Sequence, residues 1–223
     1  MFDLDDSSTT YFDAKTDFYA DLHAQSRVGR AFRIAKRGFD ISVSLILLFF
    51  MGSTAVVLLI LNPFVNPGPL FYRQDRMGQG CNPFRAIKFR TMLPALRIDR
   101  GPFDALEVNR ITTLGRVLRK TRLDELPQAI NVLKGEMSLI GPRPDYFEHA
   151  QVYLGVVPGY RERHIVKPGI SGYAQIEVGY ADGIETVQRK VNADLHYIRN
   201  ASFLFDTWIA WRTIIVVVTR KGT

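Results

Sequence analysis

The sequence ISVSLILLFFMGSTAVVLLIL, residues 41–61, decides how this chain of 223 residues is organised. No charged residue occurs between positions 41 and 72. As a helix, the 21 residues of this segment would be about 30 Å long, which matches the hydrocarbon core of a bilayer. A small domain rarely buries so long an apolar stretch. The segment therefore predicts membrane association, and a core helix of a soluble protein is the weaker alternative.

The surroundings of this segment bear on its topology. Basic residues flank it on both sides, with Lys36 and Arg37 before it and Arg73 and Arg76 after it. Because basic flanks stay on the cytoplasmic side, two of them favour a helix that returns to the side it entered from. Gly52 and Ser53 lie at the midpoint, and helices often bend at such pairs. The sequence thus favours a re-entrant helical hairpin over a helix that spans the bilayer.

The chain divides into three parts by composition. Residues 1–26 are polar and acidic and lack the apolar region of a signal peptide, so we expect a flexible N-terminal tail. Residues 27–66 form a basic juxtamembrane segment followed by the membrane helix, and an amphipathic basic helix of this kind suits an anionic membrane surface. Residues 67–223 form the remaining domain.

Charge and cysteine content limit the partners. The formal net charge is +7 and the single cysteine excludes an internal disulfide. A basic chain favours lipid headgroups, nucleotides or nucleic acid as partners. Nucleic acid is the least favoured of these, because the apolar segment has no use there and the aromatic residues form no stacking platform between basic ones. The four histidines lack zinc-ligand spacing.

The stretch TRLDELPQ, residues 121–128, carries two adjacent carboxylates, Asp124 and Glu125. Thr121 followed three residues later by Asp124 predicts a capping box, and the helix it opens would end at Gly135. The amides and dipole of that helix end would keep the carboxylates ionised and could receive a phosphate. A solvated surface helix is the alternative interpretation.

Basic residues surround this pair in the sequence. They are Arg110, Arg116, Arg119, Lys120, Arg122 and Arg143. Two prolines hold Arg143 in the stiff segment Gly-Pro-Arg-Pro, which suits capture of a phosphate by the two arms of the guanidinium group. A carboxylate pair among cations indicates metal-assisted chemistry on a phosphate ester, whereas a plain turn and solvated charges are the alternative.

The predicted fold is mixed α/β and mostly helical. Helices are expected at residues 113–120, 185–199 and 203–218, short strands at 70–72 and 84–91 around a turn with Gly78 and Gly80, and a polar loop at 97–104. The helix of residues 203–218 contains Trp208 and Trp211, which could lie in the core or at the lipid headgroups. Its charged residues, Asp206 and Arg212, argue that it does not span a bilayer.

Seven short blocks occur in order along the chain: KRGFD at 36–40, KFRTM at 88–92, LDELPQ at 123–128, NVLKGEMS at 131–138, GPRP at 141–144, KPGISG at 167–172 and DLHYIRN at 194–200. Together they resemble the bacterial sugar transferase family, and within it the monotopic polyprenyl-phosphate phosphoglycosyl transferases in their small, minimal catalytic form. Each alone could be chance, but seven in order are specific. The resemblance covers residues 36–219.

The resemblance implies a reaction at the cytoplasmic face of the bacterial inner membrane. A UDP-sugar gives its sugar phosphate to undecaprenyl phosphate, which yields undecaprenyl diphosphate sugar and UMP, in the first membrane step of polysaccharide or glycan assembly. Asp124 would be the nucleophile that forms a covalent phosphosugar intermediate. Magnesium would be required, with Asp124 and Glu125 as ligands, and Glu125 could instead be a base. We expect residues 67–223 to be the catalytic domain, with an interfacial helix at the C-terminus.

The resemblance also assigns binding residues. The phosphate- or substrate-binding candidates are Arg119, Arg143, Lys88, Arg90 and Gln175, and the membrane-contacting candidates are Lys36, Arg37, Gly52, Ser53, Trp208 and Trp211. Two places depart from the family. Gly52-Ser53 stands where relatives often have Ser-Pro, and residues 176–183 lack the usual Gly-Arg-Asn, so the donor sugar does not transfer from relatives.

Further partners and functions follow from the same residues. Anionic membrane lipids are expected partners, and a homodimer is a further assembly that the sequence allows. A membrane-surface scaffold that only binds anionic lipids is the alternative function. The nearest alternative enzyme is a phosphatase or pyrophosphohydrolase with the same two carboxylates.

Overall fold

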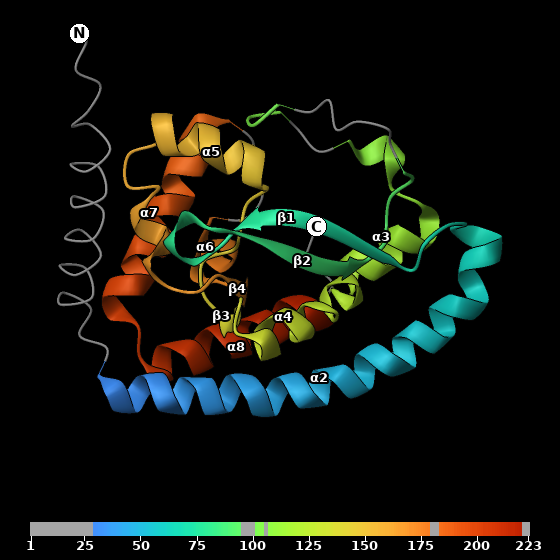
Figure 1. The fold of residues 1–223 in the computed structure, drawn as a ribbon, viewed down its shortest axis with the longest axis horizontal. Coiled ribbons are helices and arrows are strands. Elements are labelled where there is room, and N and C mark those ends of the chain that lie inside the picture. Colours follow the sequence, from blue (N-terminus) through green and yellow to red (C-terminus); the bar gives the residue numbers. More distant parts are fainter. Residues whose placement is uncertain (1–28, 95–100, 105–106, 179–182, 220–223) are drawn as a thin grey trace, which may run out of the picture.

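One long helix, α2 (Arg30–Val65), runs along one side of the protein (Figure 1). The computed structural model describes residues 29–94, 101–104, 107–178 and 183–219, so the predicted tail of residues 1–26 lies outside the described residues. The buried residues of α2 recur at helical spacing: Asp40, Ser44, Leu58 and Asn62. This stripe faces the rest of the protein, because side chains three or four positions apart share one face of a helix.

The predicted break at Gly52 and Ser53 is wrong. The helix is continuous through both residues, and the Ser53 hydroxyl donates a hydrogen bond to the Phe49 carbonyl one turn earlier at 3.1 Å. A glycine lowers helix stability without ending the helix, and the serine hydroxyl bonds within it. Proline, which does interrupt the helical hydrogen bonds, occurs only at Pro63 in the last turn.

The N-terminal half of α2 is fixed to the domain by polar contacts. Lys36 donates to the Ile140 carbonyl at 3.0 Å and forms an ion pair with Asp206. Asp40 accepts hydrogen bonds from the Ser138 hydroxyl and the Leu139 amide, both at 3.0 Å. Each bond satisfies a group that would otherwise be buried without a partner.

The C-terminal end of α2 is held in the same way. The Asn66 amide group donates to the Arg90 carbonyl at 3.1 Å, while the Arg90 guanidinium donates to the carbonyls of Asn66 and, at 2.8 Å, Pro69. Leu58 packs with Phe89 in the core between α2 and the first strand pair. Both ends of α2 therefore contact one and the same domain.

The first sheet is an antiparallel pair, β1 (Phe71–Met77) and β2 (Pro83–Phe89), joined through the turn η1 (Gln79–Cys81). Gly80 has φ 69°, a left-handed conformation that glycine adopts without strain. The first strand is longer than the predicted 70–72. Opposite residues pair as Tyr72 with Lys88 and Arg76 with Phe84. Because opposite residues point to one face, Arg76 and Lys88 lie on the same side of the sheet.

A second, parallel pair consists of β3 (Ser138–Ile140) and β4 (Gly169–Ser171). Gly141 follows β3, and Gly169 is the first residue of β4. The two backbones are so close that a Cβ on Gly169 would lie 2.2 Å from the Gly141 nitrogen. The glycines of the blocks GPRP and KPGISG thus permit two backbones to approach each other.

The remaining helices complete the domain. They are η2 (Val108–Arg110), α3 (Thr113–Lys120), η3 (Leu123–Glu125), α4 (Gln128–Lys134), α5 (Phe147–Val156), η4 (Glu162–Ile165), α6 (Tyr173–Glu177), α7 (Ile184–Asn200) and α8 (Phe203–Val218). The predicted helices at 113–120 and 203–218 are confirmed at both ends, and 185–199 is confirmed to within one residue at each end. The predicted loop at 97–104 lies partly outside the described residues, as do positions 179–182 of the divergent segment.

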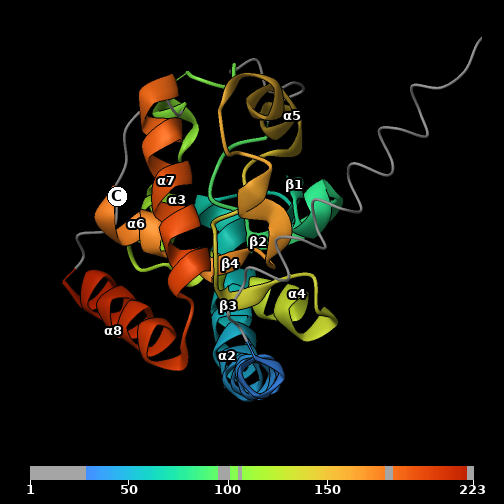
Figure 2. The same cartoon turned by 90° about the vertical axis from the view of Figure 1, so that its left-hand side faces the viewer.

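The main core joins α4, β3, α7 and α8. Val132, Met137, Ile198 and Ile209 are buried together there. In Figure 2, α2 is seen nearly end-on at the base of the molecule and α8 lies beside it. The described residues thus form a mostly helical α/β fold with two small sheets, as the sequence predicts, apart from the hairpin.

An apolar surface remains on the outward sides of α2 and α8. Its exposed members include Phe49, Ile60 and Phe64 on α2 and Leu204 and Trp211 on α8. Trp208 instead packs against Tyr173 and Phe205 and is half-buried. By length and composition, α2 could cross a membrane.

Candidate active site

The two carboxylates lie on a tight turn between α3 and α4, and the predicted capping box is wrong. Thr121 ends α3, and its hydroxyl donates to the Val117 carbonyl at 2.9 Å. Neither η3 nor α4 has a side-chain cap hydrogen bond at its start. Arg122 has φ 58°, which reverses the chain, and η3 places Asp124 and Glu125 before α4 begins at Gln128. The Thr121 amide and hydroxyl both donate to the Val117 carbonyl, so Thr121 ends the helix before it and does not open the next one.

Glu125 is held by three cations. Its Oε2 accepts from Arg143 Nη1 at 3.2 Å, and its Oε1 contacts Arg143 Nη2 and, at 2.7 Å, Lys88 Nζ. Arg122 Nη1 lies 3.8 Å from Oε2. Burial alone would raise the pKa of Glu125, but Arg143 and Lys88 hold that pKa well below its usual range. Glu125 is thus a fixed negative charge at neutral pH.

Asp124 differs from its neighbour in having a free oxygen. The residue is buried, and its Oδ1 has no hydrogen-bond partner within the described part of the chain. Burial raises the pKa of Asp124, Lys88 opposes this shift and Glu125 adds to it. From the sequence we expected a helix end to keep Asp124 ionised. The raised pKa corrects this, because the side chain is desolvated.

Lys88 reaches the site from β2. Burial lowers the pKa of Lys88 to about 8, and the Glu125 carboxylate limits that decrease. An ammonium group with this pKa keeps most of its charge at neutral pH and loses it under mildly alkaline conditions. The strand pair therefore contributes a titratable cation to the carboxylate turn.

The loop that carries Arg143 is fixed by two other arginines. Arg163 Nη2 donates to the Arg143 carbonyl at 2.8 Å, and Arg76 Nη1 donates to the Pro144 carbonyl at 2.8 Å. Arg163 is itself buried between Asp145 and Asp194, with 2.7 Å to the latter. This network holds the Arg143 backbone rigidly, so its guanidinium is preorganised.

The remaining predicted binding residues are placed differently. Arg119 Nε donates to the Thr91 hydroxyl at 2.9 Å, and Arg119 contributes to the field at Asp124. Arg90 is buried and its donors contact the carbonyls at the end of α2, which is a structural position rather than one beside the carboxylates. Gln175 lies on α6, and its Oε1 is buried without a partner among the described residues. The structure therefore brings Lys88 and Arg143 to Glu125 and leaves Arg90 elsewhere.

Three residues at the site were not predicted from the sequence as binding residues. Arg76 lies on the same sheet face as Lys88, Arg122 lies beside Glu125, and Gln128 begins α4 with its side chain buried. A first strand predicted at its full length would have placed Arg76 on the face of Lys88, since side chains alternate along a strand. The sequence holds no comparable signal for Gln128.

The donor set bears on the expected magnesium ion. Among the described residues, no group of three or more carboxylates, histidines or cysteines could hold a metal ion. Magnesium, however, is often bound by one or two carboxylates together with substrate phosphate oxygens. Asp124 fits this role through its free Oδ1. Glu125 does not fit, because both of its oxygens accept hydrogen bonds from cations.

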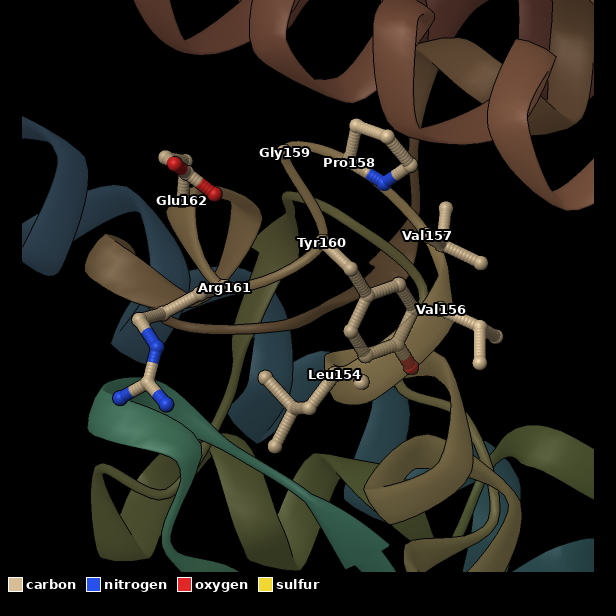
Figure 3. Close-up of a pocket in the computed structure, with 9 residues that line it drawn as sticks. Leu154, Val156, Val157, Pro158, Gly159, Tyr160, Arg161 and Glu162 are labelled. Carbon is tan, nitrogen blue, oxygen red and sulfur yellow. The ribbon is translucent and has the colours of Figure 1, made fainter.

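A pocket of about 340 Å³ lies away from the carboxylate turn. It is lined by residues 154–162, at the end of α5 and in the loop that follows. Figure 3 shows Tyr160 in the middle of this pocket, with Arg161 and Glu162 to one side. None of the residues that contact Glu125 lines this pocket. The candidate active site is the carboxylate turn, where the carboxylates and the cations meet.

The sequence of the chain also matches known proteins. The chain matches the family model of the bacterial sugar transferases over residues 31–220. It is 40% identical over 187 residues to a UDP-N-acetylgalactosamine-undecaprenyl-phosphate N-acetylgalactosaminephosphotransferase of Aeromonas hydrophila, which covers 84% of this chain and 44% of that protein. It is 39% identical over 193 residues to a UDP-glucose:undecaprenyl-phosphate glucose-1-phosphate transferase of Escherichia coli, which covers 85% of this chain and 41% of that protein.

A relative of similar length also matches. The exopolysaccharide production protein PSS of Rhizobium leguminosarum is 35% identical over 196 residues, which cover 85% of this chain and 98% of that protein. The chain spans about two fifths of the length of the relatives from Aeromonas and Escherichia.

Proposed function

Because the chain belongs to the bacterial sugar transferase family, we propose that it transfers a sugar 1-phosphate from a UDP-sugar to undecaprenyl phosphate, which gives undecaprenyl diphosphate sugar and UMP. The names of the relatives from Aeromonas and Escherichia support this donor and acceptor. The observation that carries the proposal is the difference between the two carboxylates. Glu125 is bound by cations, whereas Asp124 keeps a buried oxygen that has no partner among the described residues. The relative from Rhizobium supports a role in exopolysaccharide production.

Asp124 is the proposed nucleophile. Its carboxylate oxygen attacks the sugar-side phosphorus of the donor, the bond from that phosphorus to the bridging oxygen breaks, and UMP leaves with the bonding electrons. The resulting acyl phosphate carries the sugar. A phosphate oxygen of the lipid then attacks the same phosphorus and releases Asp124 as a carboxylate. Asp124 must be ionised to react, and the field of Lys88 favours its charged form.

The cations lower the repulsion between reacting anions. A carboxylate and a diphosphate must approach each other, and Lys88 and Arg143 stand beside that meeting point with their positions fixed by Glu125. Preorganised donors of this kind stabilise charge that develops in the transition state. Because the pKa of Glu125 is so low, we propose that Glu125 positions the cations and is not the base.

Magnesium is part of the proposal. Asp124 would hold it together with phosphate oxygens of the donor, since its Oδ1 is free. The bound ion would supply further positive charge for the diphosphate.

We further propose that the outward face of α2 enters the membrane from the cytoplasmic side and does not cross it. Both ends of α2 contact the same domain. If the outward face of α2 is inserted in the membrane, both ends of the helix therefore stay on the side of the membrane where the domain lies. Exposed Arg30 and Arg33 lie at its N-terminal end, where they would contact anionic lipids. Such a position brings the site to the depth of the acceptor phosphate at the bacterial inner membrane.

The reaction is tested by UMP release from a panel of UDP-sugars, with detergent-solubilised undecaprenyl phosphate and magnesium. We compare the wild type with Asp124→Asn and with Asp75→Asn, a surface carboxylate on β1 that is more than half exposed. We expect multiple-turnover release that needs lipid and magnesium in the wild type and Asp75→Asn, and no release in Asp124→Asn. Multiple turnovers without lipid would identify a hydrolase. No release from folded protein with any donor would favour the scaffold.

The covalent step is tested separately. Incubation with the donor alone should release at most one UMP per protein molecule and add the mass of one sugar phosphate to the peptide that contains Asp124. No UMP release and an unmodified Asp124 with the donor alone, from protein that turns over once lipid is added, would argue for direct transfer between donor and acceptor.

A further inference from the structure

A small cavity lies behind Glu125, on the sheet side of the active site. Its volume is about 10 Å³, room for one water-sized atom, and it is lined by Arg76, Ala86, Lys88, Gln128, Arg143 and Pro144. The strand pair supplies Arg76, Ala86 and Lys88 from one face, and α4 and the loop after β3 supply the others. Residues distant in sequence thus converge on a space for a single oxygen.

The cavity contains an unpaired donor. Gln128 is only 2% exposed, and its Nε2 has no hydrogen-bond partner among the described residues. A buried amide group without a partner lowers stability, because it has lost its hydrogen bonds to water. Natural proteins rarely keep such a group unless a ligand or water satisfies it. Gln128 lines the cavity, so an acceptor bound there would be next to the residue that carries this donor.

The lining also carries excess positive charge. Three cations border the cavity: Arg76, Lys88 and Arg143. Lys88 and Arg143 share a single counter-charge, the carboxylate of Glu125. Arg76 forms a hydrogen bond to the neutral Pro144 carbonyl and no ion pair within 4.0 Å in the described part of the chain. Cations and an amide donor around a small space match an atom that accepts hydrogen bonds and carries negative charge.

We propose that this cavity is a subsite for one non-bridging oxygen of the phosphate group under transfer, bound by Gln128 Nε2 and the Arg76 guanidinium. The proposal rests on the proposed function for the identity of that phosphate group. A phosphate oxygen suits the space better than water, because it accepts several hydrogen bonds and needs no acceptor for protons of its own. Ala86 keeps the space open, since a larger side chain on that face would fill it.

Binding of inorganic pyrophosphate to the full chain in detergent, measured by calorimetry, tests the subsite without any turnover. Gln128→Met keeps the size of the side chain and removes the amide, and Gln128→Glu replaces the donor with an anion. Gln151→Met, at an exposed position on α5, is the matched control. We expect wild type and control to bind equally, Gln128→Met to bind at least tenfold more weakly, and Gln128→Glu to bind more weakly still. Arg76→Lys, which keeps the charge and loses the guanidinium fork, should also weaken binding.

The outcomes separate this inference from the proposed function. Pyrophosphate binding that is absent in the wild type, or equal in Gln128→Met, Gln128→Glu and the control, would overturn the subsite even if UMP release is observed. Binding that depends on Gln128 supports the subsite even if no UDP-sugar is a donor. If Gln128→Met does not fold, as judged by its melting transition, Gln128→Glu and Arg76→Lys decide. A purely structural Gln128 would change the melting temperature and leave pyrophosphate binding unchanged in the folded variants.

Discussion

Arg143 binds both carboxylate oxygens of Glu125, with Nη1 at 3.2 Å from Oε2 and Nη2 in contact with Oε1. The planar guanidinium matches the carboxylate in shape, so the pair fixes the direction of both side chains. Glu125 also accepts from Lys88 at 2.7 Å. The second carboxylate of the pair therefore fixes the cations beside the first.

Arg143→Lys should reduce kcat/KM about 10- to 100-fold. A lysine cannot bind both oxygens of Glu125, and the loss of one hydrogen bond to a charged group corresponds to about 1.5–3 kcal/mol. UMP release measured with saturating lipid checks this. Arg116→Lys, at an exposed position on α3, is the control and should retain full activity. Equal activity of both variants would show that charge alone matters at position 143.

The pH profile of kcat/KM should fall on both sides of neutrality. Lys88 loses its proton as the pH rises through about 8, so donor binding should weaken above that pH. Asp124 must be ionised, and its raised pKa places the acidic limb above its ordinary value of 3.8. The value of kcat/KM reports the groups of the free enzyme, which is the state described.

Lys88→Arg provides the control for the alkaline limb. Arginine stays charged throughout the measured range, so the decline above pH 8 should disappear even if the maximal rate falls. An unchanged alkaline limb in this variant would assign that limb to another group.

The sequence predicts the helices of this protein better than its contacts. The ends of α3 and α8 follow from apolar spacing and composition alone. The prediction failed at Thr121, because its hydroxyl could serve either the helix before it or the one after it, and only the chain direction at Arg122 decides between them. The prediction also failed at Gly52, because a weak helix residue does not break a helix packed along its length.

The site was predictable in its carboxylates and only in part in its cations. Asp124 and Glu125 stand out as neighbours in a charged stretch, whereas Lys88 lies 37 residues from Glu125 in the sequence. Arg90 is just two positions from Lys88 and yet contacts the end of α2. Which basic residue reaches the carboxylates depends on strand register, and no local pattern specifies that register.

Gly115→Ala should destabilise the protein by about 1–3 kcal/mol or more. A Cβ at position 115 would lie 1.9 Å from the Thr91 carbonyl oxygen, so α3 would have to move away from the strand pair. Gly155→Ala is the matched control on α5, where a Cβ meets nothing within 4 Å. The control should be neutral or raise the free energy of unfolding by up to about 1 kcal/mol, since alanine favours helix. Denaturant unfolding in detergent distinguishes the two, and similar effects at both positions would contradict the close packing of α3.

The ion pair of Lys36 and Asp206 joins α2 to α8. Both side chains are largely buried, at 19% and 7% exposure, and Tyr197 donates to the second Asp206 oxygen at 2.7 Å. Lys36→Met should lower the free energy of unfolding by about 3–5 kcal/mol, because it leaves a buried carboxylate without its cation.

Adding Asp206→Asn to Lys36→Met should recover most of the lost stability, since the unpaired charge is then removed. A double-mutant cycle on denaturant unfolding measures this coupling. Arg33→Met, on the same helix at an exposed position, is the control for the loss of a basic residue and should leave stability unchanged. Independent, additive effects of the two substitutions would show that other contacts hold α2, such as the hydrogen bonds of Asp40 to β3.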